Sequence, residues 1–269
     1  MPSAETTHSC DPAVRAAVER AIVTLWDHHR EPLSLSTVAH CADLSPLRLS
    51  RAFRAQTGTS PARFLAAIRL YQAKRLLAET SMSVADVAFE TGYRNPRTFS
   101  RRFTARVGAP PERYRRLALH GASRRSLMST QRPAVRHGGM QGLVRVPDET
   151  PGMRIYVGAF TGPIVRDGPV ARDVLDAPGR YRLCAVPAGD WHIRAAAVPL
   201  APQRLAVGTA RAVVRHGERC VDADIEMRPA EVMDLPILLA LPEFDRGGAH
   251  PVPRLGFGFE PGAAGVWTA

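Results

Sequence analysis

Two serine–arginine pairs are the side chains of this sequence best suited to reading a nucleic acid. They are Ser50-Arg51 and Ser100-Arg101. An arginine guanidinium can donate two hydrogen bonds to O6 and N7 of guanine in a major groove, and a serine hydroxyl can pair with donor or acceptor groups on a base edge. A lone pair of this kind is more often part of a solvated helix face. Because both pairs occur at the same phase of an internal repeat, we favour base contacts.

The repeat predicts two similar helix pairs in the first half of the chain. Residues 34–64 match residues 83–114, with Phe53 corresponding to Phe103. Two copies are too few for a solenoid, which needs at least three stacked units. The favoured interpretation is therefore a duplicated helix-turn-helix.

Each copy contains the start signals of two helices and a tight turn between them. Ser34 and Ser83 are N-cap residues for the first helix of each copy. A cap residue followed by proline predicts the start of each second helix, at Ser45-Pro46 and at Asn95-Pro96. Between them, Gly92 and Asp43 are residues that tolerate a left-handed backbone. The turn is therefore expected at these two positions.

The second helix of each copy divides into an apolar face and a polar face. Apolar residues repeat with a spacing of four, which predicts a buried stripe. That stripe holds Leu49 and Phe53 in the first copy, and Phe99, Phe103 and Val107 in the second. The other face holds Leu47, Ser50, Arg51 and Arg54 in the first copy, and Arg97, Ser100, Arg101 and Thr104 in the second.

A long helix is predicted between the two copies. Residues 63–80 contain no proline or glycine, and their apolar residues fall near helical spacing. A helix of this length spans about 27 Å, close to the roughly 34 Å that separate successive major grooves on one side of a duplex. We therefore expect one polypeptide to contact two short boxes about ten base pairs apart.

The residues from 12 to 118 resemble the DNA-binding domain of the AraC/XylS family of bacterial transcription regulators. The signature is the run A-D-V-A-F-E-T-G-Y-R-N-P-R-T-F-S-R-R-F-T-A-R-V-G-A-P-P-E-R-Y, residues 85–114. The resemblance implies two helix-turn-helix units, about 34–58 and 83–108, joined by one long helix. Each unit would place a recognition helix in one of two adjacent major-groove segments. The implied partners are double-stranded DNA and RNA polymerase.

Specific roles follow from the positions that match the family. The resemblance implies that the base-reading side chains are Leu47, Ser50, Arg51, Arg97, Ser100 and Arg101. Leu47 departs from the larger or polar residues often found there, although it can contact a thymine methyl group. Arg54, Arg102 and Arg106 are predicted to contact phosphates, which would position the protein without reading sequence.

Charge divides the chain into a basic half and a neutral half. Residues 1–136 hold 22 Lys and Arg against 10 Asp and Glu, whereas residues 137–269 hold 14 against 15. This division is expected for a DNA reader with a separate second domain. Lys74 is the only lysine among the 36 cationic residues, which indicates a coding bias, so the number of arginines carries little weight by itself.

The second half predicts a small antiparallel β-sandwich, so the fold class is two domains, all-α plus all-β. Short runs with alternating or apolar character are separated by Gly, Pro and Asp, as in sandwiches. These runs cover residues 154–160, 180–186, 191–197, 210–214 and 221–227. Residues 177–195 are similar to a hairpin of prealbumin-like or carboxypeptidase-regulatory-like sandwiches. We predict a linker over 119–150, which could have some order near either end, and the sandwich over 151–241. The last segment, 242–269, is predicted to be a Gly/Pro-rich flexible tail, although its three aromatic residues could instead pack on the sandwich or on a partner.

Two roles for the sandwich remain open, a small-molecule effector site and dimerisation. Side chains that could line an effector site are Trp191, His192, Tyr156 and Tyr181. The favoured alternative is that the aromatic residues fill a small core and His192 faces solvent. Cys184 and Cys220 could form a redox pair, although a buried free cysteine acting as a small hydrophobe is commoner.

The sequence gives little support for an enzyme. One alternative is a DNA-repair alkyl-transferase coupled to the same reader, but neither Cys184 nor Cys220 has the Pro-Cys-His context of that chemistry. There is no nucleophile elbow, phosphate-binding loop or zinc-ligand spacing, so neither a metal nor a cofactor is expected. Without a long apolar run or paired cysteine spacing, we expect a cytoplasmic protein that does not enter the membrane.

Overall fold

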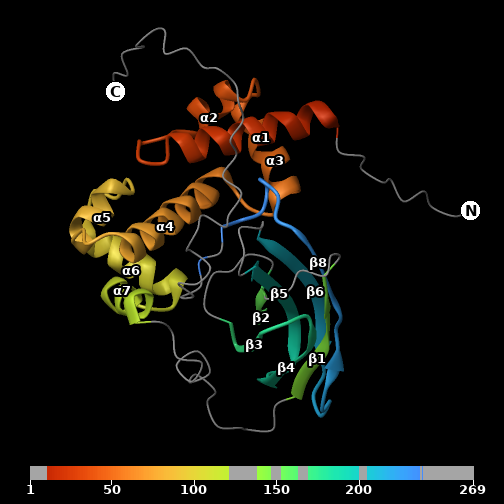
Figure 1. Cartoon of the computed structure of the whole chain (residues 1–269). Helices are drawn as coiled ribbons and strands as arrows, with labels where there is room; N and C mark the ends of the chain where they lie inside the picture. The colour runs from red at the N-terminus through yellow and green to blue at the C-terminus, as the bar shows by residue number, and fades with distance from the viewer. Residues whose placement is uncertain are drawn as a thin grey trace, which may run out of the picture.

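The chain contains a helical region followed by a separate region made mostly of β-strands. The computed structural model describes residues 11–120, 138–146, 153–162, 169–199, 205–236 and 238. Figure 1 shows the helices, coloured red to yellow, grouped beside the sheet, coloured green to blue. The predicted division into an α half and a β half is confirmed.

The helical region consists of seven helices, and their starts follow the predicted signals. The helices are α1 (Pro12–Asp27), α2 (Leu35–Cys41), α3 (Pro46–Thr57), α4 (Pro61–Glu79), α5 (Val84–Glu90), α6 (Pro96–Val107) and α7 (Pro111–His120). Ser34 Oγ accepts a hydrogen bond from the Thr37 backbone N–H at 3.1 Å, and Ser83 Oγ accepts one from Asp86 at 3.1 Å. Each cap satisfies a backbone donor that a helix start leaves without an intrahelical partner.

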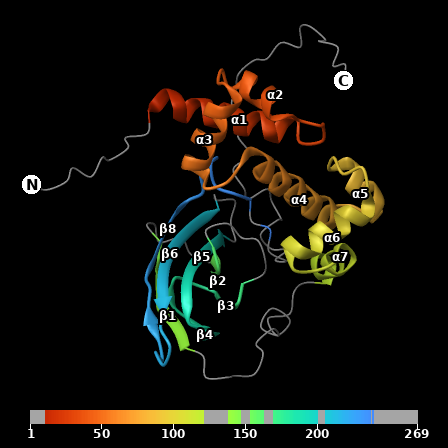
Figure 2. The ribbon, with the colours of Figure 1, turned by 180° about the vertical axis from the view of Figure 1, so that it is seen from behind.

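The long helix α4 separates two pairs of shorter helices. Figures 1 and 2 show α2 and α3 at one end of α4, and α5 and α6 at the other end. Helix α4 packs against α1, α3, α5 and α7. Its nineteen residues give a length of about 28 Å, so the helix predicted over 63–80 is present with slightly different ends.

Equivalent aromatic pairs fill the core at the two ends of α4. Phe53 and Phe64 meet edge to face at 5.5 Å between ring centroids, and Phe103 and Tyr114 do so at 5.7 Å. All four rings are fully buried, and edge-to-face geometry is favourable for aromatic rings. The single lysine, Lys74, is also buried, with Nζ 5.7 Å from the centre of the Tyr114 ring.

The β region is one curved sheet, which corrects the predicted two-sheet sandwich. Its strands are β1 (Gly138–Arg145), β2 (Met153–Phe160), β3 (Ala171–Leu175), β4 (Gly179–Val186), β5 (Gly189–Pro199), β6 (Ala206–Val214), β7 (Val221–Asp222) and β8 (Ile225–Pro229). The strand order is β3-β2-β5-β6-β8-β1-β4, and β7 also pairs with β1. Strand β1 runs parallel to β7 and β8, so the sheet is not purely antiparallel.

The short strand β8 makes the sheet continuous. Its first residues, Ile225 and Glu226, pair with β1, whereas Met227 to Pro229 pair with β6. The two ends of the sheet, β3 and β4, also meet, because Asp173 Oδ2 accepts a hydrogen bond from the Arg182 backbone N–H at 2.9 Å. The result is a nearly closed, barrel-like sheet around one apolar core.

Strand β1 lies inside the segment predicted to be a linker, and this prediction was wrong for residues 138–145. Glycine is frequent in β1, and Gly142 is required there by close packing. A Cβ at Gly142 would lie 2.1 Å from the carbonyl oxygen of Ala223, and glycine in a strand often marks such an approach. Residues 121–137 of the predicted linker and the predicted tail, 242–269, lie outside the described residues.

A segment after β8 connects the sheet to the helices. We call residues 230–236 the post-β8 segment. Its apolar side chains Val232, Met233 and Leu235 pack against the helical core, together with Leu238. Figure 1 shows this part of the chain, in blue, rising from the sheet toward the helices. The helical core therefore includes side chains from the far end of the sequence.

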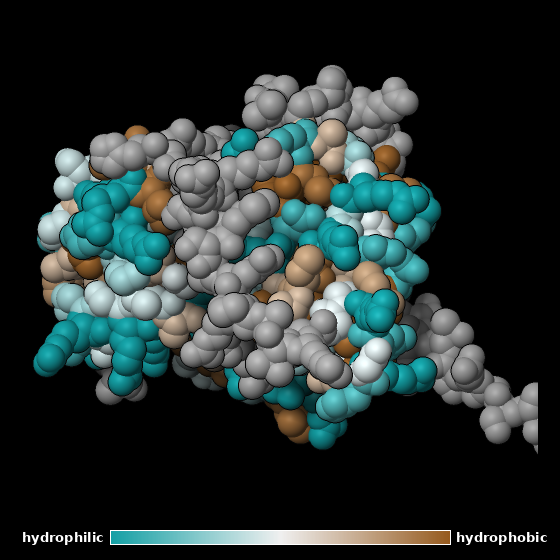
Figure 3. Space-filling model, turned by 90° about the horizontal axis from the view of Figure 1, so that it is seen from below, coloured by the Kyte–Doolittle hydropathy of each residue, from teal (hydrophilic) through white to brown (hydrophobic). Residues whose placement is uncertain are grey.

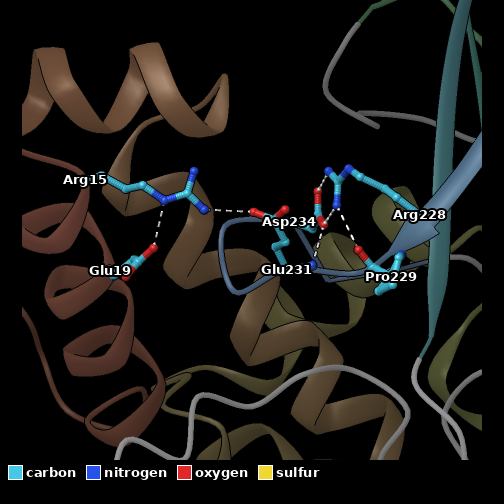
Figure 4. A network of polar contacts seen from close by, with 6 residues as sticks. All are labelled: Arg15, Glu19, Arg228, Pro229, Glu231 and Asp234. Atoms are coloured by element: carbon cyan, nitrogen blue, oxygen red, sulfur yellow. Dashed lines mark hydrogen bonds and ion pairs between the residues drawn. The ribbon is translucent and has the colours of Figure 1, made fainter. Parts of the chain in front are cut away.

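Polar contacts accompany this packing (Figure 4). Arg15 of α1 donates to Glu231 at 3.0 Å, and Arg228 of β8 binds Asp234 with two hydrogen bonds of 2.8 Å each. The Arg15–Glu231 pair is about half exposed, and exposed ion pairs contribute only about 0–1 kcal/mol. The apolar contacts of the post-β8 segment are therefore the main stabilising part of this connection.

Candidate nucleic-acid interface

Helices α3 and α6 have the same local construction. Ser45 caps α3 by accepting from the Arg48 N–H at 3.4 Å, and Asn95 caps α6 by accepting from Arg97 and Thr98 at 2.9 and 3.1 Å. Each helix has twelve residues, begins with proline and ends at a left-handed glycine. The two helices therefore present equivalent positions in equivalent settings.

The six side chains predicted to read bases lie on one face of each helix. At 100° per residue, positions 47, 50 and 51 fall on one side of α3, and positions 97, 100 and 101 on one side of α6. Leu47 is 63 % exposed, and Arg51, Arg97 and Arg101 are exposed, while both serines are half-buried. The sheet does not cover these faces. Arg54 shares the face of α3 and is exposed.

Arg102 and Arg106 lie on a different side of α6. Arg106 is nine residues beyond Arg97, which places it about 180° around the helix. It is half-buried and lines a cavity between the helices and the sheet. Its position therefore favours contacts with that cavity over phosphate contacts beside Arg97.

Hydrophilic residues are prominent around the second helix pair. Seen from below, teal side chains gather at the left of the molecule, where α5–α7 lie (Figure 3). Among the exposed residues there are Arg94, Arg97, Arg101 and Arg102. This end of the molecule is therefore suited to a polyanionic partner.

The turn between α5 and α6 is built against the connection between α1 and α2. Gly92 has φ +81, and a Cβ there would meet the carbonyl oxygens of Arg30 and His29 at 2.8 and 2.9 Å. Arg69 of α4 donates to the carbonyls of His29 and Glu31 at 2.6 and 2.7 Å. Burial lowers the pKa of the Arg69 guanidinium. These contacts hold the α5–α6 turn and α4 against the connection between α1 and α2.

Replacing Gly92 by alanine should therefore destabilise the protein more than replacing Gly58. Both glycines have a positive φ, but nothing lies within 4 Å of a Cβ at Gly58. For Gly58→Ala we expect about 1–2 kcal/mol from the left-handed backbone alone, and for Gly92→Ala a further 1–3 kcal/mol, roughly, from overpacking. Urea unfolding followed by circular dichroism measures both. Equal losses would show that the connection yields to the added methyl group.

The side chains proposed for an effector site in the sheet do not gather in one place. Trp191 and Tyr181 belong to the core, where Trp191 Nε1 donates to the Pro187 carbonyl at 2.8 Å and the Tyr181 hydroxyl donates to Ala223 at 2.5 Å. His192 is half-buried, and burial lowers its pKa. Tyr156 alone of the four lines the cavity between helices and sheet. The prediction that the aromatic residues fill a small core therefore holds for Trp191 and Tyr181.

The two cysteines of the sheet region have different surroundings. Cys184 and Cys220 are free thiols, and Cys184 is exposed on β4 because alternate residues of that strand face outward. Cys184 is therefore not the small core hydrophobe that was predicted, whereas Cys220 is half-buried. No group of three or more His, Cys, Asp or Glu side chains in the described ranges could hold a metal ion. No described helix combines the length and the apolar character of a membrane span.

Comparison with known proteins places the helical region in a family. Residues 38–117 match the family model described as a helix-turn-helix domain. A 95-residue stretch is 35 % identical to the uncharacterized HTH-type transcriptional regulator YobQ of Bacillus subtilis, and a 100-residue stretch is 34 % identical to the HTH-type transcriptional activator RhaS of an Enterobacter species. The N-terminal region is an AraC-type helix-turn-helix region. The relatives are transcription regulators, and they give no support to the alkyl-transferase alternative.

The chain spans less than half the length of these two relatives. The matches cover 35 % and 37 % of this chain, and they span only 39 % of YobQ and 36 % of RhaS. A solved structure of a probable AraC family transcriptional regulator from Rhodopseudomonas palustris is 27 % identical, covers 40 % of this chain and 98 % of that one, and has a TM-score of 0.35.

Proposed function

We propose that the protein is a sequence-specific DNA-binding transcription regulator that reads two adjacent major-groove segments with α3 and α6. The observation that carries this proposal is the pair of equivalent exposed faces within the AraC-type region. Each face combines an arginine, a serine and a third side chain at the same helical phase. Arginine and serine suit base edges in a major groove, and the named relatives are transcription regulators.

The length of α4 supports contact with two grooves on one side of the duplex. Its span of about 28 Å is similar to the roughly 34 Å between successive major grooves. The two helix pairs lie at its opposite ends (Figure 2). One polypeptide would therefore occupy two boxes about ten base pairs apart.

The sheet region is proposed to serve regulation or assembly. The post-β8 segment packs against the helical core. A conformational change in the sheet would therefore act on the DNA-reading helices through this segment. Homodimerisation and contact with RNA polymerase belong to the same proposal. We place the protein in the cytoplasm because a regulator of this kind acts on chromosomal DNA.

Selection of bound duplexes from a random pool tests the proposal. The full-length chain is used at one fixed salt concentration, and the enriched sequences are aligned. One pair of boxes about ten base pairs apart supports a monomer that uses both helices, whereas inverted pairs support a dimer. A single box, or no enrichment, would contradict reading by two helices.

A separate prediction distinguishes phosphate contacts from base contacts. Arg54→Ala should weaken binding on every duplex and reduce the slope of log K against log salt by about one unit, because one fewer counterion is released. Arg106→Ala should leave this slope nearly unchanged, since Arg106 lines the interdomain cavity. Binding isotherms over a salt series measure both slopes. An unchanged slope for Arg54→Ala would remove that residue from the phosphate contacts.

A further inference from the structure

A cavity of about 490 Å³ lies between the helical region and the sheet. Its helical wall comes from α4 and from the end of α6, and its opposite wall comes from β2, β5, β6 and β8. The post-β8 segment closes part of it through Asp234 and Leu235. Binding sites for small molecules commonly have this size and often lie at domain interfaces.

The sheet wall is the outer face of strands whose inner face forms the barrel core. In β2, Ile155 and Val157 belong to that core, whereas Tyr156 and Phe160 line the cavity. Both cavity-facing aromatic residues are buried. Leu70 and Met227 add apolar surface from the two walls. The cavity therefore offers aromatic and aliphatic contacts to the body of a ligand.

Positive charge enters the cavity from both regions. Its lining includes four arginines and two carboxylates, which leaves a formal excess of two positive charges. The arginines are Arg63, Arg106, Arg194 and Arg228, and the acids are Glu226 and Asp234. Asp234 is already bound by Arg228 through two hydrogen bonds of 2.8 Å. After this pair, Arg63, Arg106, Arg194 and Glu226 leave the described lining with its formal excess of two positive charges.

Arg194 is central to the electrostatics of this space. It lies on β5, on the outer face of the sheet, and is half-buried. Burial lowers the pKa of its guanidinium, and Asp234 partly offsets that effect. A charge removed from water is stabilised by a nearby opposite charge, so an anion in the cavity would be favoured.

We propose that this cavity binds one small amphipathic organic anion, whose carboxylate or sulfonate contacts arginines of both regions and whose apolar body lies against Tyr156 and Phe160. The ligand bridges the sheet and the helix that carries Arg97 and Arg101. This binding site goes beyond the proposed DNA reading, and its test requires no DNA. It also gives the sheet a role in ligand binding, for which the aromatic residues buried in its core are not accessible.

Two fluorescent probes that differ in one group test the site. The aromatic sulfonate 8-anilinonaphthalene-1-sulfonate and its neutral analogue N-phenyl-1-naphthylamine have nearly the same apolar body. Each is titrated into the full-length chain at fixed salt. We expect one sulfonate bound per chain, and an affinity at least roughly tenfold higher than that of the neutral analogue, because charge-assisted hydrogen bonds are lost without the sulfonate.

Variants from both walls test the bridging contact. Arg194→Gln and Arg106→Gln should each weaken sulfonate binding roughly tenfold and leave binding of the neutral analogue nearly unchanged. The matched control is Arg211→Gln, an exposed arginine on β6 that is outside the cavity lining. If Arg194→Gln unfolds, as judged by circular dichroism, Arg63→Gln from α4 takes its place. Equal binding of the two probes, or equal effects of the cavity and control variants, would overturn the proposal.

Discussion

Replacement of Arg51 or Arg101 by alanine should weaken binding to the selected duplex by about 1–3 kcal/mol and relax the preference at one base pair. Both arginines are exposed on equivalent faces of α3 and α6. A guanidinium that bridges O6 and N7 of guanine distinguishes that base from the other three, so its loss should affect one position of one box. Dissociation constants for the selected duplex and its single-base-pair variants measure the effect.

Arg211 provides a matched control for this prediction. It is an exposed arginine of β6 and belongs to neither of the two reading helices. Arg211→Ala should change affinity little and should leave the base preference intact. If Arg51→Ala instead weakens selected and random duplexes equally, Arg51 contacts phosphate and the base-reading assignment fails.

The helical region could be predicted because its signals are local. The caps at Ser34 and Ser83, and the left-handed turn residues Asp43 and Gly92, all have the predicted conformation. Capping and turn geometry depend on a few neighbouring residues. The internal repeat gave an independent check, because each cap and turn signal occurs twice at equivalent positions.

The sheet was less predictable because its signals are not local. Strand β1 contains Gly142, which reads as a loop residue until its closeness to Ala223 is known. The continuity of the sheet depends on β8, whose first residues pair with β1, a strand far earlier in the sequence, and whose last residues pair with β6. Strand pairing of this kind is decided by tertiary contacts. The alternation of polar and apolar residues therefore identified most strands but predicted the wrong arrangement of these strands in the sheet.

The interface between the two regions was missed for a similar reason. Tyr156 and Phe160 are apolar residues on the outer face of a strand, where exposure would be the default. They are buried because that face lines the interdomain cavity. Likewise, Arg106 resembled a phosphate contact by charge, whereas its helical phase directs it to the same cavity. One usable signal was the unbroken apolar run of β2, which is typical of a strand covered on both faces.

A second large effect is expected in the helical core. Phe103→Ala should lower the free energy of unfolding by about 3–5 kcal/mol, because it removes a fully buried ring and leaves a cavity. The Phe103 ring contacts Phe99 and Tyr114 at 5.5 and 5.7 Å between centroids. Phe89→Ala is the control, since Phe89 is 56 % exposed and its loss should change stability by about 0.5 kcal/mol or less. Urea unfolding followed by far-UV circular dichroism measures both.

The same measurement on Phe53→Ala shows whether the two helix pairs unfold together. Phe53 occupies the equivalent place in the first pair and is also fully buried. Because both rings belong to one continuous core around α4, either substitution should shift a single helical transition by a similar amount. Two separated transitions, each moved by only one substitution, would show that α4 joins two independent units. In that case the distance between the two reading faces would not be fixed by the core, and a strict spacing between the boxes would no longer be expected.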